Sequence, residues 1–263
     1  MMITLLRKKL ILTSLLLFVC PQIALAESNK LNIGIFYLAP HMIIDEEREV
    51  YSGAAVEYFA KIAEEMQVEY KVRGYPFPRL MKMLYSGEID AALFLAKNED
   101  RANHLGYPKL GYFETESVLA VTDDSPLGDL SELEVLRGLI IGTTSKVFKT
   151  PSMRHDWLIF EYLTGGKSLY WQHFNKLQKG RIDAVYFPDK AALMFEARRA
   201  NVSKSDIRYL TLPDPKVDIY TVFSDAVSAE YLPQYEEAAR KVMSEQTYQQ
   251  FLLEYIINSH SFQ

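Results

Sequence analysis

The sequence predicts an α/β protein made of two lobes, each a mostly parallel sheet flanked by helices. Short apolar segments alternate with longer segments of helical period in both halves of the chain, and this alternation is typical of parallel sheets. A Gly-x-Ile-Asp-Ala pattern occurs at 87–91 and again at 180–184, each time after a helical segment. The polar, turn-rich segment 123–129 lies between the halves and indicates a lobe boundary.

The first half predicts a β-α-β-α-β unit. Apolar strands are expected at 31–36, 68–72 and 89–95, and helices at 53–66 and 76–85. The prolines at the start of the second helix stand where proline is tolerated, and the glycine that follows it is a natural helix stop. Such a unit implies a parallel sheet with helices on both faces.

The second half repeats the alternation and ends in a long helical region. Its expected strands are 117–122, 139–143, 182–187 and 218–223. Its expected helices are 157–163, 172–178, 190–199 and 230–255.

These elements predict that the C-terminal segment returns to the first lobe. The first lobe would then comprise residues 27–119 and 219–263, and the second lobe residues 120–218. The chain would cross between the lobes near 120–123 and again near 217–220. Two crossings of this kind predict a hinge.

The amino terminus has the order of a secretory signal peptide. Basic residues at 7–9 precede an apolar run at 10–19 and small residues at 24–26, so cleavage is expected after Ala26. The apolar run is too short to span a bilayer comfortably. The only cysteine, Cys20, lies in this segment, where lipidation is the less favoured alternative because Val19 is larger than such sites use. We therefore expect an exported, periplasmic protein without disulfides.

Charge and motif content exclude several function classes. Residues 1–26 carry three basic side chains and no acid, so their removal changes the formal charge from −5 to −8. A mild acidic excess without clustered Lys and Arg argues against nucleic acid as a partner. No GxSxG, HExxH, paired-cysteine or phosphate-loop pattern occurs, and the five histidines are scattered. We therefore predict no catalytic residue, no metal site and no cofactor.

One arginine stands where a ligand would be expected. The segment 86–102 combines a helix end, a nearly continuous apolar strand and, just past the strand, Arg101. In an open α/β sheet, ligands bind beyond the carboxyl ends of the strands, so Arg101 is the first candidate for a ligand contact. The alternative is an arginine paired with Asp100 or Glu99, or one that caps a helix end.

Four segments resemble the motifs of one family. They read Ala-Pro-His at 39–41, Gly-Ala-Ala-Val-Glu at 53–57, Gly-Glu-Ile-Asp-Ala at 87–91 and Asn-Glu-Asp-Arg at 98–101. Over nearly all of the mature chain, the order of elements resembles the bacterial periplasmic solute-binding proteins of the polar amino-acid type (family 3), the receptors of ATP-driven importers. The resemblance implies the type II periplasmic-binding-protein fold, two lobes joined by a two-crossing hinge. We also expect a monomer.

The resemblance implies roles for four residues. Arg101 falls on the arginine that holds the ligand's α-carboxylate in relatives, and a guanidinium fits a carboxylate bidentately. Asp189 most nearly matches the acid that pairs with the ligand's amino group. Phe77 takes the place of a pocket tryptophan, and His41 that of a pocket phenylalanine. An aspartate at 189 that is solvated, or that caps the following helix, is the alternative.

Four further positions are expected at the same site. Ala96 stands where relatives carry a threonine, so a hydroxyl donor is missing, and Thr144 lies in a turn that departs from the family's Gly-Ser/Thr pattern. Tyr37 and Trp171 belong to a group of aromatic residues at the expected mouths of the two lobes. For any one of these aromatics taken alone, an ordinary place in the core is the favoured interpretation.

The sequence thus predicts a periplasmic receptor, not an enzyme. We expect it to capture a small polar solute, an amino acid or related carboxylate, and to deliver it to an ABC importer in the membrane. The alternative is a ligand-sensing module that reports to a membrane signalling protein. A dehydratase-like enzyme on the same fold is a less favoured third reading.

Overall fold

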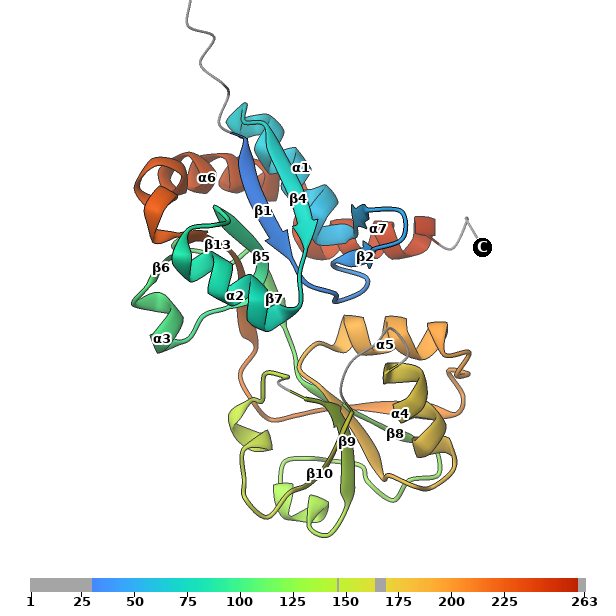
Figure 1. Ribbon diagram of the computed structural model, residues 1–263. Helices are drawn as coiled ribbons and strands as arrows, with labels where there is room; N and C mark the ends of the chain where they lie inside the picture. The colour runs from blue at the N-terminus through green and yellow to red at the C-terminus, as the bar shows by residue number, and fades with distance from the viewer. Residues whose placement is uncertain (1–29, 146, 164–168, 260–263) are drawn as a thin grey trace, which may run out of the picture.

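Two separate β-sheets organise the protein (Figure 1). The computed structural model describes residues 30–145, 147–163 and 169–259. The first sheet has the strand order β4-β1-β5-β13-β6, with β7 also paired to β13, and the second has the order β10-β9-β11-β8-β12. Figure 1 shows the first sheet in the upper body of the molecule and the second in the lower body. A small hairpin of β2 (Ile43–Asp45) and β3 (Val50–Ser52) accompanies the first sheet.

The first sheet takes strands from distant parts of the chain. They are β1 (Leu31–Ile35), β4 (Tyr70–Gly74), β5 (Ala91–Ala96), β6 (Leu105–Gly106), β7 (Phe113–Thr115) and β13 (Val217–Ser224). β1 pairs in parallel with β4 and β5, whereas β13 runs antiparallel to β5. The predicted β-α-β-α-β unit is therefore present, and the last strand of the chain extends the same sheet.

Helices α1 (Ala54–Met66) and α2 (Phe77–Ser86) connect the parallel strands. α1 buries Tyr58, Phe59 and Ile62, because residues three and four apart share one face of a helix. Full burial of a side chain of this size stabilises a fold by about 1.5–3 kcal/mol. α2 ends where Gly87 adopts a left-handed φ of 75°, which glycine tolerates because it has no Cβ. The chain then enters β5, which is buried except at its last residue.

The second sheet is covered by two helices of its own. Its strands are β8 (Val118–Thr122), β9 (Ile140–Thr144), β10 (Ile159–Leu163), β11 (Ala184–Phe187) and β12 (Ile207–Thr211). The helices are α4 (Leu169–Gln178) and α5 (Lys190–Arg199), with short 3-10 turns η1 (Leu133–Leu136) and η2 (Pro151–Met153). β9 is parallel to β10 and β11, and β8 is antiparallel to β11 and β12. Both sheets are thus parallel on one side and antiparallel on the other.

The helix predicted at 157–163 is wrong, because the chain there forms the edge strand β10. Its residues are mostly β-branched and aromatic, which favour a strand, and the segment is short for a helix. Ile159 and Tyr162 are exposed, so the apolar sequence does not indicate a buried helix face. Pairing with β9 over five residues decides its structure.

The chain passes between the two sheets twice. Residues 116–117 lead from β7 to β8, and residues 212–216 lead from β12 back to β13 (Figure 1). The last helices, α6 (Asp225–Glu245) and α7 (Tyr248–Ser259), both pack on α1 in the first body. Among the described residues, no helix combines the length and the apolarity that a bilayer crossing requires.

Candidate ligand-binding cleft

A cavity of about 970 Å³ lies between the two bodies. Its walls come from the carboxyl ends of β1 and β5, from the turns after β9 and β11, and from the strands that connect the sheets. Eight of the described lining residues are aromatic: Phe36, Tyr37, Tyr75, Phe77, Phe94, Phe148, Tyr170 and Phe187. The charged residues among the described lining are Glu46, Arg101 and Asp189. Apolar walls with a few polar groups are the usual composition of a small-molecule site.

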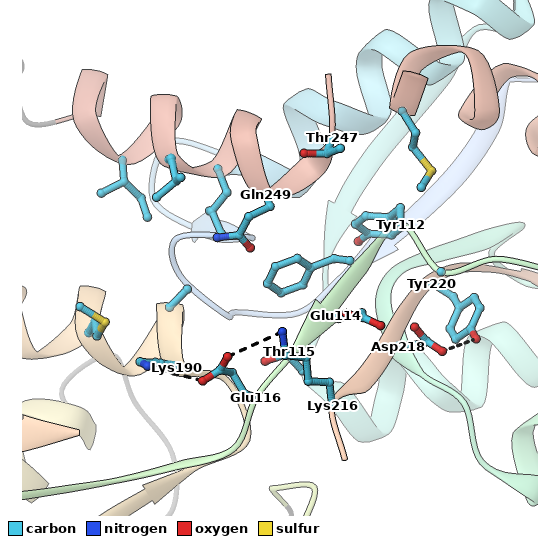
Figure 2. A pocket seen from close by; sticks show the side chains of 18 of the residues that line it. Tyr112, Glu114, Thr115, Glu116, Lys190, Lys216, Asp218, Tyr220, Thr247 and Gln249 are labelled. Carbon is cyan, nitrogen blue, oxygen red and sulfur yellow. Dashed lines mark hydrogen bonds and ion pairs between the residues drawn. The ribbon is translucent and has the colours of Figure 1, made fainter. Parts of the chain in front are cut away.

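A second cavity, of about 840 Å³, lies on the opposite face of β13. Val217 and Ile219 line the first cavity, whereas Asp218 and Tyr220 line the second, because side chains alternate along a strand. Figure 2 shows that Glu116 in this second cavity lies between two lysines. Their Nζ atoms are 3.4 Å and 3.9 Å from its carboxylate oxygens, and the lysines are Lys190 and Lys216.

Arg101 gives the first cavity a cation that has no acidic partner among the described residues. The residue lies on the short helix α3 (Glu99–Ala102), which begins where the Asn98 side chain accepts a hydrogen bond from the Arg101 amide. Its Nη1 donates to the Ala96 carbonyl, 2.9 Å away, and its guanidinium carbon lies 5.4 Å from the centre of the Phe77 ring. The guanidinium forms no ion pair with a carboxylate of the described residues, and Asp100 instead accepts from Tyr85. Most of its donors are therefore available to a ligand.

Asp189 is buried and already hydrogen-bonded. It is the N-cap of α5, where Oδ1 accepts from the Ala192 amide at 2.7 Å. Oδ2 accepts from the Thr115 hydroxyl at 2.9 Å, and Nε2 of His41 lies 3.3 Å from the same oxygen. Burial alone would raise the pKa of Asp189, but His41 and these hydrogen bonds together hold it below its ordinary value. The carboxylate therefore stays ionised.

His41 lies beneath the cavity and does not line it. The Ala55 amide at the start of α1 donates to its carbonyl at 2.8 Å, which fixes the backbone. Its ring stacks on Phe94 with 4.1 Å between centres, and Nδ1 lies 2.6 Å from the Tyr248 hydroxyl. Phe94 has a left-handed φ of 61°, a conformation that costs a non-glycine residue about 1–3 kcal/mol. This strained position points to a functional reason for where the Phe94 ring lies.

A second set of contacts joins the first body to α5. The Tyr37 hydroxyl donates to Glu196 at 3.0 Å, and Arg199 contacts both side chains. Burial and the neighbouring Glu196 raise the pKa of Tyr37 to about 12, so the phenol keeps its proton. Together with the contact between His41 and Asp189, these bonds hold the two bodies against each other along α5.

Six of the eight predicted binding residues line the cavity, and two do not. The six are Arg101, Asp189, Phe77, Ala96, Tyr37 and Thr144. His41 is fully buried behind Asp189. The Trp171 side chain is 53% exposed, whereas Tyr170 beside it lines the cavity, because one residue along a helix turns the side chain by about 100°.

Several residues of this site were not expected from the sequence, and three of them contribute to its geometry. Thr115 joins the crossing strand to Asp189, Phe94 covers His41, and Tyr170 lines the cavity. Nothing in the local pattern distinguishes Thr115 or Phe94, since both depend on contacts between distant segments. Tyr170 lies near the start of α4, before the residue at which the sequence predicts that helix to begin. A correct start would have placed Tyr170 on the inward face of α4.

The arrangement is suited to holding a molecule. Among the described residues, no group of three or more His, Cys, Asp or Glu side chains is placed to hold a metal ion. Arg101 from the first body and the buried acid Asp189 from the second line the same cavity, together with eight aromatic residues. This combination fits a small organic acid with an apolar body.

Solved structures of the same fold are known. The chain is 17% identical to the GluR0 ligand-binding core from Nostoc punctiforme, solved with L-glutamate, with a TM-score of 0.67 over 86% of this chain and 98% of that one. It is 18% identical to ArtJ, an arginine-, lysine- and histidine-binding protein from Geobacillus stearothermophilus, with a TM-score of 0.65 over 86% and 94%. It is 16% identical to a histidine kinase sensor domain similar to periplasmic binding proteins, with a TM-score of 0.66 over 86% and 96%. At these identities the likeness shows the fold alone, which is the predicted two-lobed α/β fold.

The sequence itself identifies the family. No curated protein matches the chain. Residues 31–257 match a family described as bacterial extracellular solute-binding proteins, family 3, and this match covers most of the chain. The chain therefore belongs to the bacterial extracellular solute-binding proteins, family 3.

Proposed function

We propose that this protein captures a small carboxylate in the cleft between its lobes and delivers it to an ABC importer in the membrane. The observation that carries this proposal is the guanidinium of Arg101, which faces an aromatic cavity and has no acidic partner among the described residues. A guanidinium fork fits a carboxylate with two parallel hydrogen bonds, and apolar walls strengthen such a contact by excluding water.

Capture is proposed to work through movement of the lobes. We assign residues 30–115 and 217–259 to the first lobe and residues 118–211 to the second, with the hinge at the crossings 116–117 and 212–216, because β8 belongs to the second sheet and β13 to the first. A ligand that contacts both lobes binds the closed arrangement more tightly than the open one. It shifts the equilibrium toward the closed arrangement by that difference in binding free energy. The cavity has walls from both bodies, which supports this proposal.

A thermal-shift screen tests the proposal. A ligand that binds only the folded state at a hundredfold excess over its dissociation constant stabilises the protein by about 2.7 kcal/mol. For a chain of this size, that raises the melting temperature by about 5–10 °C. The library should contain amino acids, polyamines, dicarboxylates, other small carboxylic acids and short peptides. A melting temperature that no member raises would contradict the receptor function.

A sensing module is the second candidate, because one structure of this fold is a histidine kinase sensor domain. A pull-down from solubilised membranes, with the ligand present, separates the two. Recovery of an importer permease supports delivery, and recovery of a signalling protein supports sensing. We propose that the protein acts in the periplasm as a monomer, after signal-peptide cleavage following Ala26. The intact mass of the exported protein would test the cleavage site.

We further propose that the protein binds its ligand without changing it. Incubation with prephenate-like acids, followed by chromatography of the acid, tests the alternative of a dehydratase-like enzyme. An unchanged acid supports binding alone. Conversion that is absent from a sample lacking the protein would support the enzyme instead.

A further inference from the structure

We infer that the cleft prefers monocarboxylates with an aromatic or apolar body and no α-ammonium group over the amino acids of the same body. This inference rests on the proposed function, in which Arg101 holds the carboxylate. The inference depends on the acceptor groups of the cleft that would have to bind the α-ammonium group of an amino acid.

Asp189 is the buried acid of the cleft, and three donors already contact its two oxygens. Oδ1 faces the Ala192 amide at 2.7 Å and Nε2 of His41 at 3.4 Å. Oδ2 faces the Thr115 hydroxyl at 2.9 Å and the same His41 nitrogen at 3.3 Å. Three donors thus share about four lone-pair positions, with His41 Nε2 placed between the two oxygens, while the Thr115 hydroxyl also lies 3.0 Å from the Pro188 carbonyl. A ligand ammonium would have to displace one of these partners from a side chain that is only 4% exposed.

Two further acceptors of the described lining are also unsuited to an ammonium. The Ala96 carbonyl at the end of β5 already accepts from Arg101 at 2.9 Å and from the Tyr107 hydroxyl at 3.2 Å. Glu46, the remaining acid of the described lining, is exposed, and an ion pair in water adds little to affinity. The segments 146 and 164–168, which lie outside the described residues, contain no Asp or Glu.

The walls indicate what the ligand's body is. Phe77 and Phe36 form an edge-to-face pair with 5.0 Å between centres beside Arg101, and Tyr170 and Phe187 form another at 5.3 Å on the opposite side. An aromatic or branched aliphatic body buries apolar area against these rings. An α-ammonium among them exchanges its hydration for cation–π contacts alone, which replace only part of that hydration, so we expect it to cost about tenfold or more in affinity.

Matched pairs of acids test the inference. Each pair differs only in the α-ammonium group: 3-phenylpropanoate against L-phenylalanine, and 4-methylpentanoate against L-leucine. Calorimetric titration of the mature protein at pH 7 should show that at least one ammonium-free acid binds about tenfold or more tightly than its amino acid. Equal or tighter binding of the amino acids would overturn the inference while leaving the proposed function intact. Absence of binding by all four acids would also overturn it, and the broad thermal-shift screen then decides the proposed function separately.

A variant tests whether Asp189 is the cause of the preference. Thr115→Val keeps the shape of the side chain but removes the hydroxyl that donates to Oδ2. A lone-pair position of the carboxylate then becomes available, so the affinity ratio between the ammonium-free acid and the amino acid should fall several-fold. An unchanged ratio in a variant with a wild-type circular dichroism spectrum would overturn the role given to Asp189.

Discussion

Replacing Arg101 by alanine should weaken binding of a carboxylate ligand by about 30- to 150-fold. Removing one member of a desolvated, hydrogen-bonded charge pair costs about 2–5 kcal/mol, because the other charge is left without a partner. Arg101 keeps some solvent contact, so we expect the lower part of that range, about 2–3 kcal/mol. Arg101→Lys should recover part of the loss, since the charge remains and the bidentate geometry does not.

The fold should survive this change. Arg101 lies on a short exposed helix, and the Ala96 carbonyl that it contacts keeps the Tyr107 hydroxyl as a donor. No buried acceptor is therefore left unpaired. Arg137 is the matched control, because its guanidinium also stacks on an aromatic ring, at 4.7 Å from the centre of Trp157, but it does not line the cleft.

Calorimetric titration with the carboxylate found in the screen measures these effects. The affinities of Arg101→Ala and Arg101→Lys should be lower than that of the wild-type protein. Arg137→Ala should keep the wild-type affinity. Affinity of Arg101→Ala within threefold of wild type would refute the assignment of the ligand's carboxylate to this guanidinium. A comparable loss in Arg137→Ala would refute the argument that position within the cleft, and not stacked charge alone, decides affinity.

Four other measurements test the structure and the proposed closure. Tyr248→Phe should lower the free energy of unfolding by about 1–3 kcal/mol in urea titrations, since it leaves Nδ1 of buried His41 unpaired. Tyr112→Phe should be nearly neutral, because that buried hydroxyl makes no hydrogen bond among the described residues. Burial lowers the pKa of His173, so as the pH falls below about 6.5 the unfolded chain takes up a proton at this residue before the folded protein does. The free energy of unfolding should then drop by up to about 1.4 kcal/mol per pH unit. His173→Gln should remove this dependence in urea titrations at pH 7 and pH 5.5. Small-angle scattering should show a smaller radius of gyration at saturating ligand, and an unchanged radius would count against closure.

The parallel units of the fold could be predicted from the sequence because each depends on local periodicity. The helix-to-strand junction at Gly87 is an example, since the apolar face of α2, the left-handed glycine and the buried run of β5 are all visible in the sequence. The helix predicted at 157–163 was wrong because a short apolar run does not distinguish an edge strand from a helix. Pairing with β9, a long-range contact, decides that segment.

The site was less predictable than the fold for the same reason. Arg101 follows a strand end that the sequence marks, and it lines the cleft. The Ala192 amide at the start of α5 is a local partner of Asp189, the helix cap considered from the sequence, but His41 and Thr115 come from distant segments that no local pattern brings to its oxygens. The orientation of α4 moves Trp171 to the surface, and a sequence that does not fix where a helix starts does not fix which aromatic residue faces inward.

A crystal structure of the protein with its carboxylate ligand tests the central claim most directly. We predict carboxylate oxygens about 2.7–2.9 Å from the guanidinium nitrogens of Arg101, the distance of a charge-assisted hydrogen bond. The ligand's body should lie among the rings of Phe77, Tyr170 and Phe187. A ligand bound in the second cavity, or one in the cleft whose carboxylate contacts other groups and leaves Arg101 unpaired, would contradict the account.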